Sequence, residues 1–292
     1  MRNLLKRLFD FLIYSNLYIA IAAVMFTVES QIQFGLKPEF HPYLFLILFA
    51  TLFEYNLHKF VAVFFYKHAL KEEKFKWISD HIRLFYFIVF ASVIGFIAAA
   101  CFAKWAVLFT LFPLGAMTFL YSFPVYKNGV KLFRLREVPL AKIFIISFVW
   151  SATCILLPVI QAGMPIDLQT ISILIVERFL FVFAITVPFD IRDMESDKRS
   201  GLKTLPLILG EDKALRIAEF AIILFMICII FHYGQLHQFM YMIAFLTSGI
   251  TTWIFIQNKS IRKAKEYHYG VLDGTMILQG ILLLLAYWVT NR

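Results

Sequence analysis

The chain has 292 residues, of which 61% are hydrophobic and 34 are Phe, and its formal net charge is +9. A soluble domain has roughly 45–50% apolar residues, so this composition excludes a water-soluble globular protein and indicates that lipid covers most of the chain. Nucleic acid is not an expected partner, because the basic residues are distributed as membrane topology requires and would contact anionic lipid headgroups.

Apolar runs of about 20 residues, the length that crosses a bilayer, follow one another along the whole chain. We place nine of them at residues 9–28, 42–65, 84–103, 105–123, 140–160, 171–189, 215–231, 239–256 and 271–289. The first run follows a basic start but has no small-residue cleavage site after it, so it is read as a span and not as a signal peptide. Since no long polar segment separates the runs, the sequence predicts an all-α polytopic membrane bundle of about nine transmembrane helices, forming a single transmembrane domain over residues 1–292.

Lys and Arg concentrate in alternate connections between these runs, which is the pattern that sets membrane orientation. Counted with the N-terminal tail, these connections hold 23 of the 28 basic residues: Arg2, Lys6, Arg7, Lys67, Lys71, Lys74, Lys76, Arg83, Lys127, Lys131, Arg134, Arg136, Lys142, Arg192, Lys198, Arg199, Lys203, Lys213, Arg216, Lys259, Arg262, Lys263 and Lys265. The N-terminus is therefore expected on the cytoplasmic side and the C-terminus on the opposite side.

Three aspartates follow the sixth run at positions i, i+3 and i+7, namely Asp190, Asp193 and Asp197. On one continuous helix they would lie within about 60° of one another, as a stripe of carboxylates at the membrane surface. Mg²⁺ binds carboxylate oxygens and keeps positions for water or phosphate oxygens, so the stripe is a candidate metal site. The alternative is a solvated helix end that is neutralised by Arg192, Lys198 and Arg199.

The segment from Asp190 to Pro206 resembles the second aspartate-rich motif of the UbiA-type intramembrane prenyltransferases, where DxxDxxxD precedes a basic, Gly-containing turn and a Thr-Leu-Pro-like stretch. Tyr121-Ser122-Phe-Pro124, followed by a basic loop that ends at Pro139 and Lys142, is also similar to that family. The resemblance implies a helical bundle in which Mg²⁺ and a prenyl diphosphate are held under cytoplasmic loops, and in which a lipophilic acceptor receives the isoprenoid group. It implies metal-binding and catalytic roles for Asp190, Asp193 and Asp197, and contacts to the diphosphate from Lys142 and neighbouring residues such as Tyr121, Arg192 and Lys198.

The first aspartate-rich motif of the family departs from its pattern in this chain. Asn56 matches, but the aspartate positions hold Leu57, Phe60 and Phe64, so the metal site that the family builds there cannot form. Lys59 lies on the same helical stripe as Asn56, and a lysine within a membrane span usually has a purpose. It could bind the diphosphate in place of one metal ion, pair with Asp190 or Asp193, or extend to the membrane surface.

Five further polar residues admit simpler interpretations. Glu54 and His58 are an i, i+4 pair that can satisfy each other. Glu177 and Arg178, about 20 Å from Asp190 along the helix, are expected to form an interfacial or structural pair. Asp273 opens the last run and is expected to cap that helix, with a carboxylate facing the site as the alternative.

The sequence thus favours a membrane prenyltransferase that moves an isoprenoid from its diphosphate to a hydrophobic, possibly aromatic or quinone-precursor, acceptor. The missing first motif keeps open a member of the family that binds an isoprenoid lipid without catalysis. A transporter is less favoured, because internal repeats and paired broken helices are not apparent.

Overall fold

The computed structural model describes residues 2–65, 73–122, 126–128, 131–133, 135–165, 167–264 and 266–291. Within these ranges it does not describe the side chains of residues 2–5, 58, 60–65, 73–76, 122, 126–128 and 131–133. The following residues named above, or their side chains, therefore lie outside the described part: Arg2, His58, Phe60, Phe64, Lys67, Lys71, Lys74, Lys76, Ser122, Pro124, Lys127, Lys131, Arg134 and Lys265.

The described chain is almost entirely helical, as predicted, with one short antiparallel hairpin. Its α-helices are α1 (Arg2–Tyr14), α2 (Leu17–Gln33), α3 (Pro42–Phe65), α4 (Glu73–Asp80), α5 (Ile82–Phe102), α6 (Trp105–Ser122), α7 (Ala141–Ala162), α8 (Leu168–Arg192), α9 (Met194–Arg199), α10 (Leu205–Leu209), α11 (Glu211–Gln235), α12 (Phe239–Gln257), α13 (Lys259–Arg262) and α14 (Asp273–Thr290). The hairpin pairs β1 (Tyr126–Asn128) with β2 (Lys131–Phe133) and is followed by the 3₁₀-helix η2 (Leu135–Glu137). A π-helix, η3 (Tyr267–Leu272), leads directly into α14.

The first predicted span is wrong as a single helix, because the chain breaks between α1 and α2. The segments Lys6–Tyr14 and Leu17–Gln33 are bent by 73°. Asn16 adopts a left-handed conformation with φ 63°, and its side chain donates to Asn56 Oδ1 on α3 at 3.0 Å. Asn56 in turn donates to the Ser15 carbonyl at 3.0 Å. The side chains of Asn16 and Asn56 and the Ser15 carbonyl at the break are thus hydrogen-bonded within the protein. A bend whose polar groups are satisfied in this way is compatible with a lipid environment.

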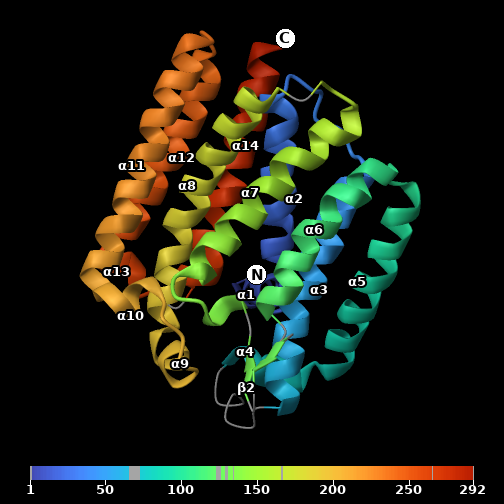
Figure 1. The fold of residues 1–292 in the computed structure, drawn as a ribbon, viewed down its shortest axis with the longest axis vertical. Helices are drawn as coiled ribbons and strands as arrows, with labels where there is room; N and C mark the ends of the chain where they lie inside the picture. Colours follow the sequence, from blue (N-terminus) through green and yellow to red (C-terminus); the bar gives the residue numbers. More distant parts are fainter. Residues whose placement is uncertain are drawn as a thin grey trace.

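Six of the long helices pack in a closed circle. Neighbours in this circle are α2, α14, α12, α11, α8 and α7, and α7 packs back on α2. Helices α3, α5 and α6 lie on the side of α2 and α7 (Figure 1). Helix α4, the hairpin and α9 lie at one end of the bundle, and the C-terminus lies at the other (Figure 1). We call the first of these the basic end, because the basic connections gather there.

The apolar helices present large side chains outward. Phe87 and Phe90 of α5 are each 66% exposed, and only 17% of the apolar window of α5 is buried within the protein. Six helices are long and apolar enough to cross a membrane by length and composition, or seven with the bent pair α1 and α2. Within the described residues, Pro42–Leu57 and Trp105–Tyr121 are shorter apolar segments, so the count of nine is not established by this criterion.

Candidate active site

The three predicted aspartates do not share one helix. Helix α8 ends at Arg192, and Asp193 is both the C-cap of α8 and the residue before α9. The backbone N–H of Asp193 still donates to the Phe189 carbonyl at 3.0 Å, and that of Asp197 donates to the Asp193 carbonyl at 2.8 Å. The three carboxylates fall into two groups, because Asp190 and Asp197 share one cationic partner and Asp193 has another.

Lys142 brings two of these carboxylates together. Its Nζ lies 2.8 Å from Asp190 Oδ1 and 2.9 Å from Asp197 Oδ2. The Asp190 side chain is 1% exposed and that of Asp197 is 11% exposed, so both carboxylates are largely removed from water. The backbone N–H of Leu140 donates to the Lys203 carbonyl at 3.0 Å, which holds the start of α7 beside the segment after α9. Burial explains the arrangement, because two carboxylates at this depth require a cation.

Asp193 pairs instead with its neighbour Arg192. The guanidinium donates from Nε to Oδ1 at 2.8 Å and from Nη2 to Oδ2 at 3.0 Å. Its Cζ lies 5.0 Å from the ring centroid of Phe189 and 4.7 Å from that of Tyr269, and these two centroids are 6.3 Å apart. Arg192 Nη1 is buried and has no hydrogen-bond acceptor among the described residues. This donor is therefore available to another group.

The carboxylates are suitable ligands for a hard divalent ion, but they are not arranged as a complete set of ligands. Asp190 Oδ2 is buried and has no hydrogen-bond donor within the described part of the chain. No group of three or more His, Cys, Asp or Glu side chains that could hold a metal ion is present among the described residues. Asp190 and Asp197 would supply the carboxylate oxygens for such an ion, and the buried Asp190 Oδ2 without a hydrogen-bond donor supports that fit.

The residues predicted from the degenerate first motif belong to the break between α1 and α2. Asn56 is fully buried and donates to the Leu52 carbonyl at 2.8 Å as well as to Ser15. Lys59 Nζ donates to the Tyr14 carbonyl at 2.8 Å, at the last residue of α1. These hydrogen bonds give both residues a structural role at the break between α1 and α2, in addition to any contact with a substrate.

The remaining predicted residues differ in their distance from this cluster. Tyr121, near the end of α6, lies within electrostatic reach of Lys142, Asp190 and Asp197. Lys198 is exposed on α9. The structure thus groups Tyr121 with the aspartates and leaves Lys198 on the surface.

The sequence did not indicate that several residues of η3 lie together beside Arg192. Tyr269 covers Arg192, and His268 Nε2 lies 3.2 Å from the Pro188 carbonyl. The Tyr18 hydroxyl donates to the Gly270 carbonyl at 3.1 Å. A π-helix has no local signature of the kind that marks a helix cap, so only the fold reveals that these residues gather beside Arg192.

Glu177 and Arg178 do not pair with each other, which corrects the interpretation given above. Arg178 Nη2 lies 2.7 Å from Glu29 Oε1, and Glu177 Oε1 lies 2.8 Å from His232 Nδ1. Consecutive residues on a helix point about 100° apart, so each reaches a different neighbour. Gln279 of α14 also donates to Glu29, so the network joins α2, α8 and α14.

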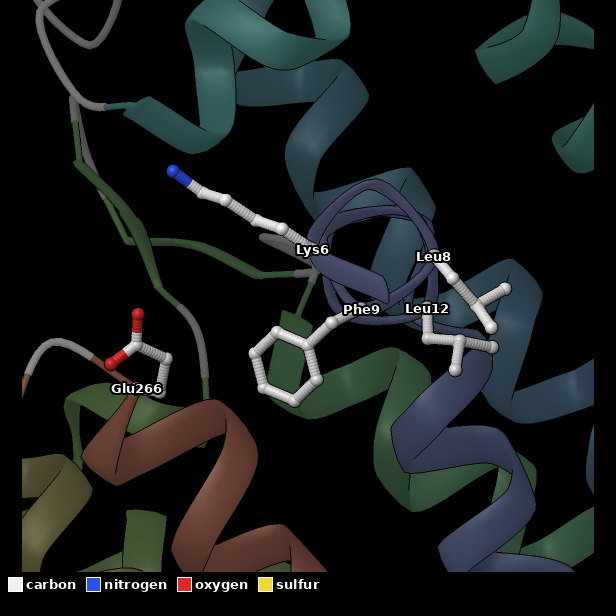
Figure 2. Close-up of a pocket in the computed structure, with 5 residues that line it drawn as sticks. All are labelled: Lys6, Leu8, Phe9, Leu12 and Glu266. Carbon is white, nitrogen blue, oxygen red and sulfur yellow. The ribbon is translucent and has the colours of Figure 1, made fainter. Parts of the chain in front are cut away.

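The larger of two described clefts, about 530 Å³, lies between α1 and the residue before η3. Its lining residues are Lys6, Leu8, Phe9, Leu12 and Glu266, with Phe9 extending from α1 toward the segment of Glu266 (Figure 2). A side chain at Gly270 would place its Cβ 3.0 Å from Phe9 Cζ. The cleft is therefore adjacent to η3, although no predicted site residue lines it.

Comparison with known proteins supports one family. The family model described as the UbiA prenyltransferase family matches residues 81–268, which is more than half of the chain. A comparison with curated proteins found no match.

Solved structures of a UbiA homologue and of a digeranylgeranylglyceryl phosphate synthase share the fold at low sequence identity. A UbiA homologue from Archaeoglobus fulgidus bound to DMAPP and Mg²⁺ is 13% identical, with a TM-score of 0.61 over 95% of this chain and 99% of that one. The same homologue bound to Cd²⁺ is 14% identical, with a TM-score of 0.60 over 96% of this chain and 100% of that one. A digeranylgeranylglyceryl phosphate synthase is 16% identical, with a TM-score of 0.52 over 97% and 98% of the two chains. With its apolar helices and the matched family model, this chain is an integral, multi-pass membrane protein that belongs to the UbiA prenyltransferase family.

Proposed function

We propose that this protein is a Mg²⁺-dependent prenyltransferase that moves an isoprenoid group from a prenyl diphosphate to a lipophilic acceptor within the membrane. The observation that carries the proposal is the buried cluster of Asp190 and Asp197 around Lys142 at the basic end. Family membership and the relatives bound to DMAPP or GPP with Mg²⁺ support it.

In this proposal Asp190, Asp193 and Asp197 are the metal-binding and catalytic carboxylates. A bound Mg²⁺ would neutralise the diphosphate and so promote cleavage of the allylic C–O bond. Lys142 and Arg192 already lie beside the aspartates with side chains that are 15% and 27% exposed, and each has its charge balanced by a carboxylate. If Mg²⁺ takes over those carboxylates, both cations become available to phosphate oxygens.

The other predicted substrate contacts are Tyr121, Lys198, Asn56 and Lys59. Tyr121 is grouped with Lys142, and Lys198 lies on α9 where a loop cation would meet a substrate that approaches from the basic end. Asn56 and Lys59 form hydrogen bonds to the backbone at the break between α1 and α2. A contact of these residues with substrate would therefore depend on how the break positions their side chains.

Diphosphate release from labelled prenyl diphosphates by the purified protein, with Mg²⁺ or with EDTA, tests the proposal. We expect Mg²⁺-dependent release, and a loss of about 10²-fold or more in rate for Asp190→Asn, because a charge-stabilising group of the transition state is removed. Asp212→Asn, at an exposed site of α11, is the matched control. Tight Mg²⁺-dependent binding without release, using chain lengths from DMAPP upward and an extracted lipid mixture as acceptor, would favour the non-catalytic family member instead. The observation that favours that second candidate is the absence of the first-motif aspartates, whose positions hold Leu57, Phe60 and Phe64.

A further inference from the structure

Buried polar groups that the proposed function does not use lie at both ends of the bundle. At the basic end, Asp273 is 7% exposed, and the prediction that it caps α14 is wrong, because its side chain makes no cap hydrogen bond and η3 runs directly into α14. At the other end, which carries the C-terminus and which we call the far end, a buried amide oxygen belongs to the wall of a separate cleft (Figure 1). The far end therefore has both a cleft and an unmatched polar group.

This cleft is the smaller of the two described clefts, with a volume of about 230 Å³. It lies between the connection of α2 to α3 and the last turn of α7, and its lining residues are Leu36, Lys37, Glu39, His41, Tyr43, Pro158, Gln161 and Ala162. Sites that enclose a whole small ligand have volumes of roughly 300–1,000 Å³, so this cleft suits a headgroup whose remaining part lies outside it.

The inner wall of the cleft presents hydrogen-bond acceptors. Gln161 Oε1 is buried and receives no hydrogen bond from the described residues, and the same holds for Oε1 of the fully buried Gln31. The amide nitrogen of Gln31 donates to the Tyr43 hydroxyl and, at 2.9 Å, to the Glu39 carbonyl, which ties Gln31 to two lining residues. Since a buried acceptor without a donor is costly, this wall favours a ligand with N–H or O–H groups.

The rim of the cleft carries charges of both signs. Lys37 Nζ lies 2.9 Å from Glu39 Oε1, with side chains that are 71% and 49% exposed. Lys104, although not a lining residue, donates from Nζ to the backbone carbonyl of Gln161 and so brings a second ammonium group to the cleft. An exposed ion pair is weak, so Lys37 and Glu39 can separate around a ligand that has a negative and a positive group.

Exposed aromatic side chains place the cleft at the level of the lipid headgroups. Phe40, beside Glu39, is 84% exposed, and Trp105, beside Lys104, is 76% exposed. In membrane proteins, aromatic side chains next to charged ones are typical of the boundary between the hydrocarbon core and water. Phospholipid headgroups are therefore the polar groups that surround this cleft at the highest concentration.

We propose that this cleft binds the headgroup of a phospholipid with a primary ammonium group, as in phosphatidylethanolamine. The ammonium group donates to Gln161 Oε1 and to the Glu39 carboxylate, while Lys37 and Lys104 donate to the phosphate oxygens. A choline headgroup has the same charges but no N–H donor, and a glycerol headgroup has donors but no positive charge. Neither matches the amide oxygen and the carboxylate together. This lipid site is separate from the proposed prenyltransferase site and does not depend on it.

Native mass spectrometry of the purified protein tests this selectivity with phosphatidylethanolamine, phosphatidylcholine and phosphatidylglycerol of identical acyl chains. We expect phosphatidylethanolamine to bind at least about tenfold more tightly than either other lipid, which corresponds to one hydrogen bond from a charged group. Gln161→Met keeps the backbone carbonyl that Lys104 contacts and should remove most of this preference. Gln235→Met, at the exposed last residue of α11, is the matched control and should retain it.

Hydrogen–deuterium exchange of the parent protein in nanodiscs tests the location and does not require a variant to fold. With phosphatidylethanolamine present, amides of residues 36–43 and 158–162 should exchange more slowly than in phosphatidylcholine alone, whereas residues 236–238, between α11 and α12, should not change. Equal affinity for phosphatidylethanolamine and phosphatidylcholine, an unchanged preference in Gln161→Met, or protection confined to other segments would overturn the proposal.

Discussion

The ammonium group of Lys142 neutralises Asp190 and Asp197 at distances of 2.8 and 2.9 Å. Truncating one partner of a buried ion pair typically costs about 3–5 kcal/mol, because the other charge remains buried. Here the Lys142 side chain is 15% exposed, so the cost is expected at the lower end of that range or below it. The same two carboxylates would remain in place for a metal ion.

We therefore expect Lys142→Met to lower the melting temperature in EDTA. Adding Mg²⁺ should raise the melting temperature of Lys142→Met by more than it raises that of the parent protein. Thermal unfolding in detergent, followed with and without Mg²⁺, measures both quantities. Lys198→Met, at an exposed lysine of α9, is the control and should change neither. An equal response to Mg²⁺ in Lys142→Met and in the parent would argue against a metal between Asp190 and Asp197.

Lys59 allows a second test at the level of single residues. If it contributes a charge to the diphosphate site, Lys59→Met should weaken prenyl diphosphate binding more than tenfold, or about 1.4 kcal/mol. If its only role is the bond to the Tyr14 carbonyl at the end of α1, binding should be unchanged and stability should fall by about 0.5–1.5 kcal/mol. Ligand titration and thermal unfolding of the same variant distinguish these outcomes.

At the scale of helices, three interruptions determine where the site residues lie. The break before α2 engages Asn56 and Lys59, and the break after α8 lies at Asp193. The π-helix η3 brings Tyr269 over Arg192. In lipid each interruption must satisfy its own backbone groups or bury them in protein. The packing of α2 against α14 fixes two of the three interruptions relative to each other.

Gly280 permits that packing, and it provides a test. A Cβ at this position would lie 3.0 Å from Met25 Cβ and 3.1 Å from the Met25 carbonyl oxygen, which cannot move without its helix. The overpacking cost of about 1–3 kcal/mol should exceed the gain of about 0.5–1 kcal/mol from replacing a helical glycine. Gly280→Ala should thus lower thermal stability, whereas Gly234→Ala, with nothing within 4 Å of the new Cβ, should not. A Gly280→Ala protein as stable as the parent would show that α2 and α14 are not held this closely.

At the scale of the whole molecule, two of the buried charged groups in the described part of the chain lie at different depths. The aspartate cluster occupies the basic end, while the buried network of Glu29, Arg178 and Gln279 ties α2, α8 and α14 together deeper in the bundle. Arg178 is 2% exposed and its guanidinium lies 4.3 Å from the Phe26 ring centroid, so its charge is held entirely by protein groups. The inward placement of these charges leaves the outer surface of the bundle to apolar side chains.

The distribution of basic residues also predicts orientation. We expect the basic end, with the N-terminus, to lie in the cytoplasm and the C-terminus on the opposite side. In a variant with the exposed Cys101 replaced by Ser, an introduced cysteine at Lys263 should react with a membrane-impermeant thiol reagent only after the cells are opened. An introduced cysteine at Lys37 should react in intact cells. The reverse pattern at both positions would invert the proposed topology.

The apolar runs and the basic connections are local features that predicted a helical membrane bundle, and the resemblance of the segment from Asp190 to Pro206 to a known motif predicted the UbiA type. The division near Lys104 followed equally from the sequence, since α5 ends at Phe102 and α6 begins at Trp105. What the tertiary structure decided are the partners of each charge. Lys142 joins two carboxylates that lie 48 and 55 residues away, and Glu29 reaches Arg178 across 149 residues. Pairings of this kind depend on which helix faces meet and on where helices break. Neither is encoded by local spacing, because a buried charge takes whichever counterion or hydrogen-bond donor the packing of the bundle brings within reach.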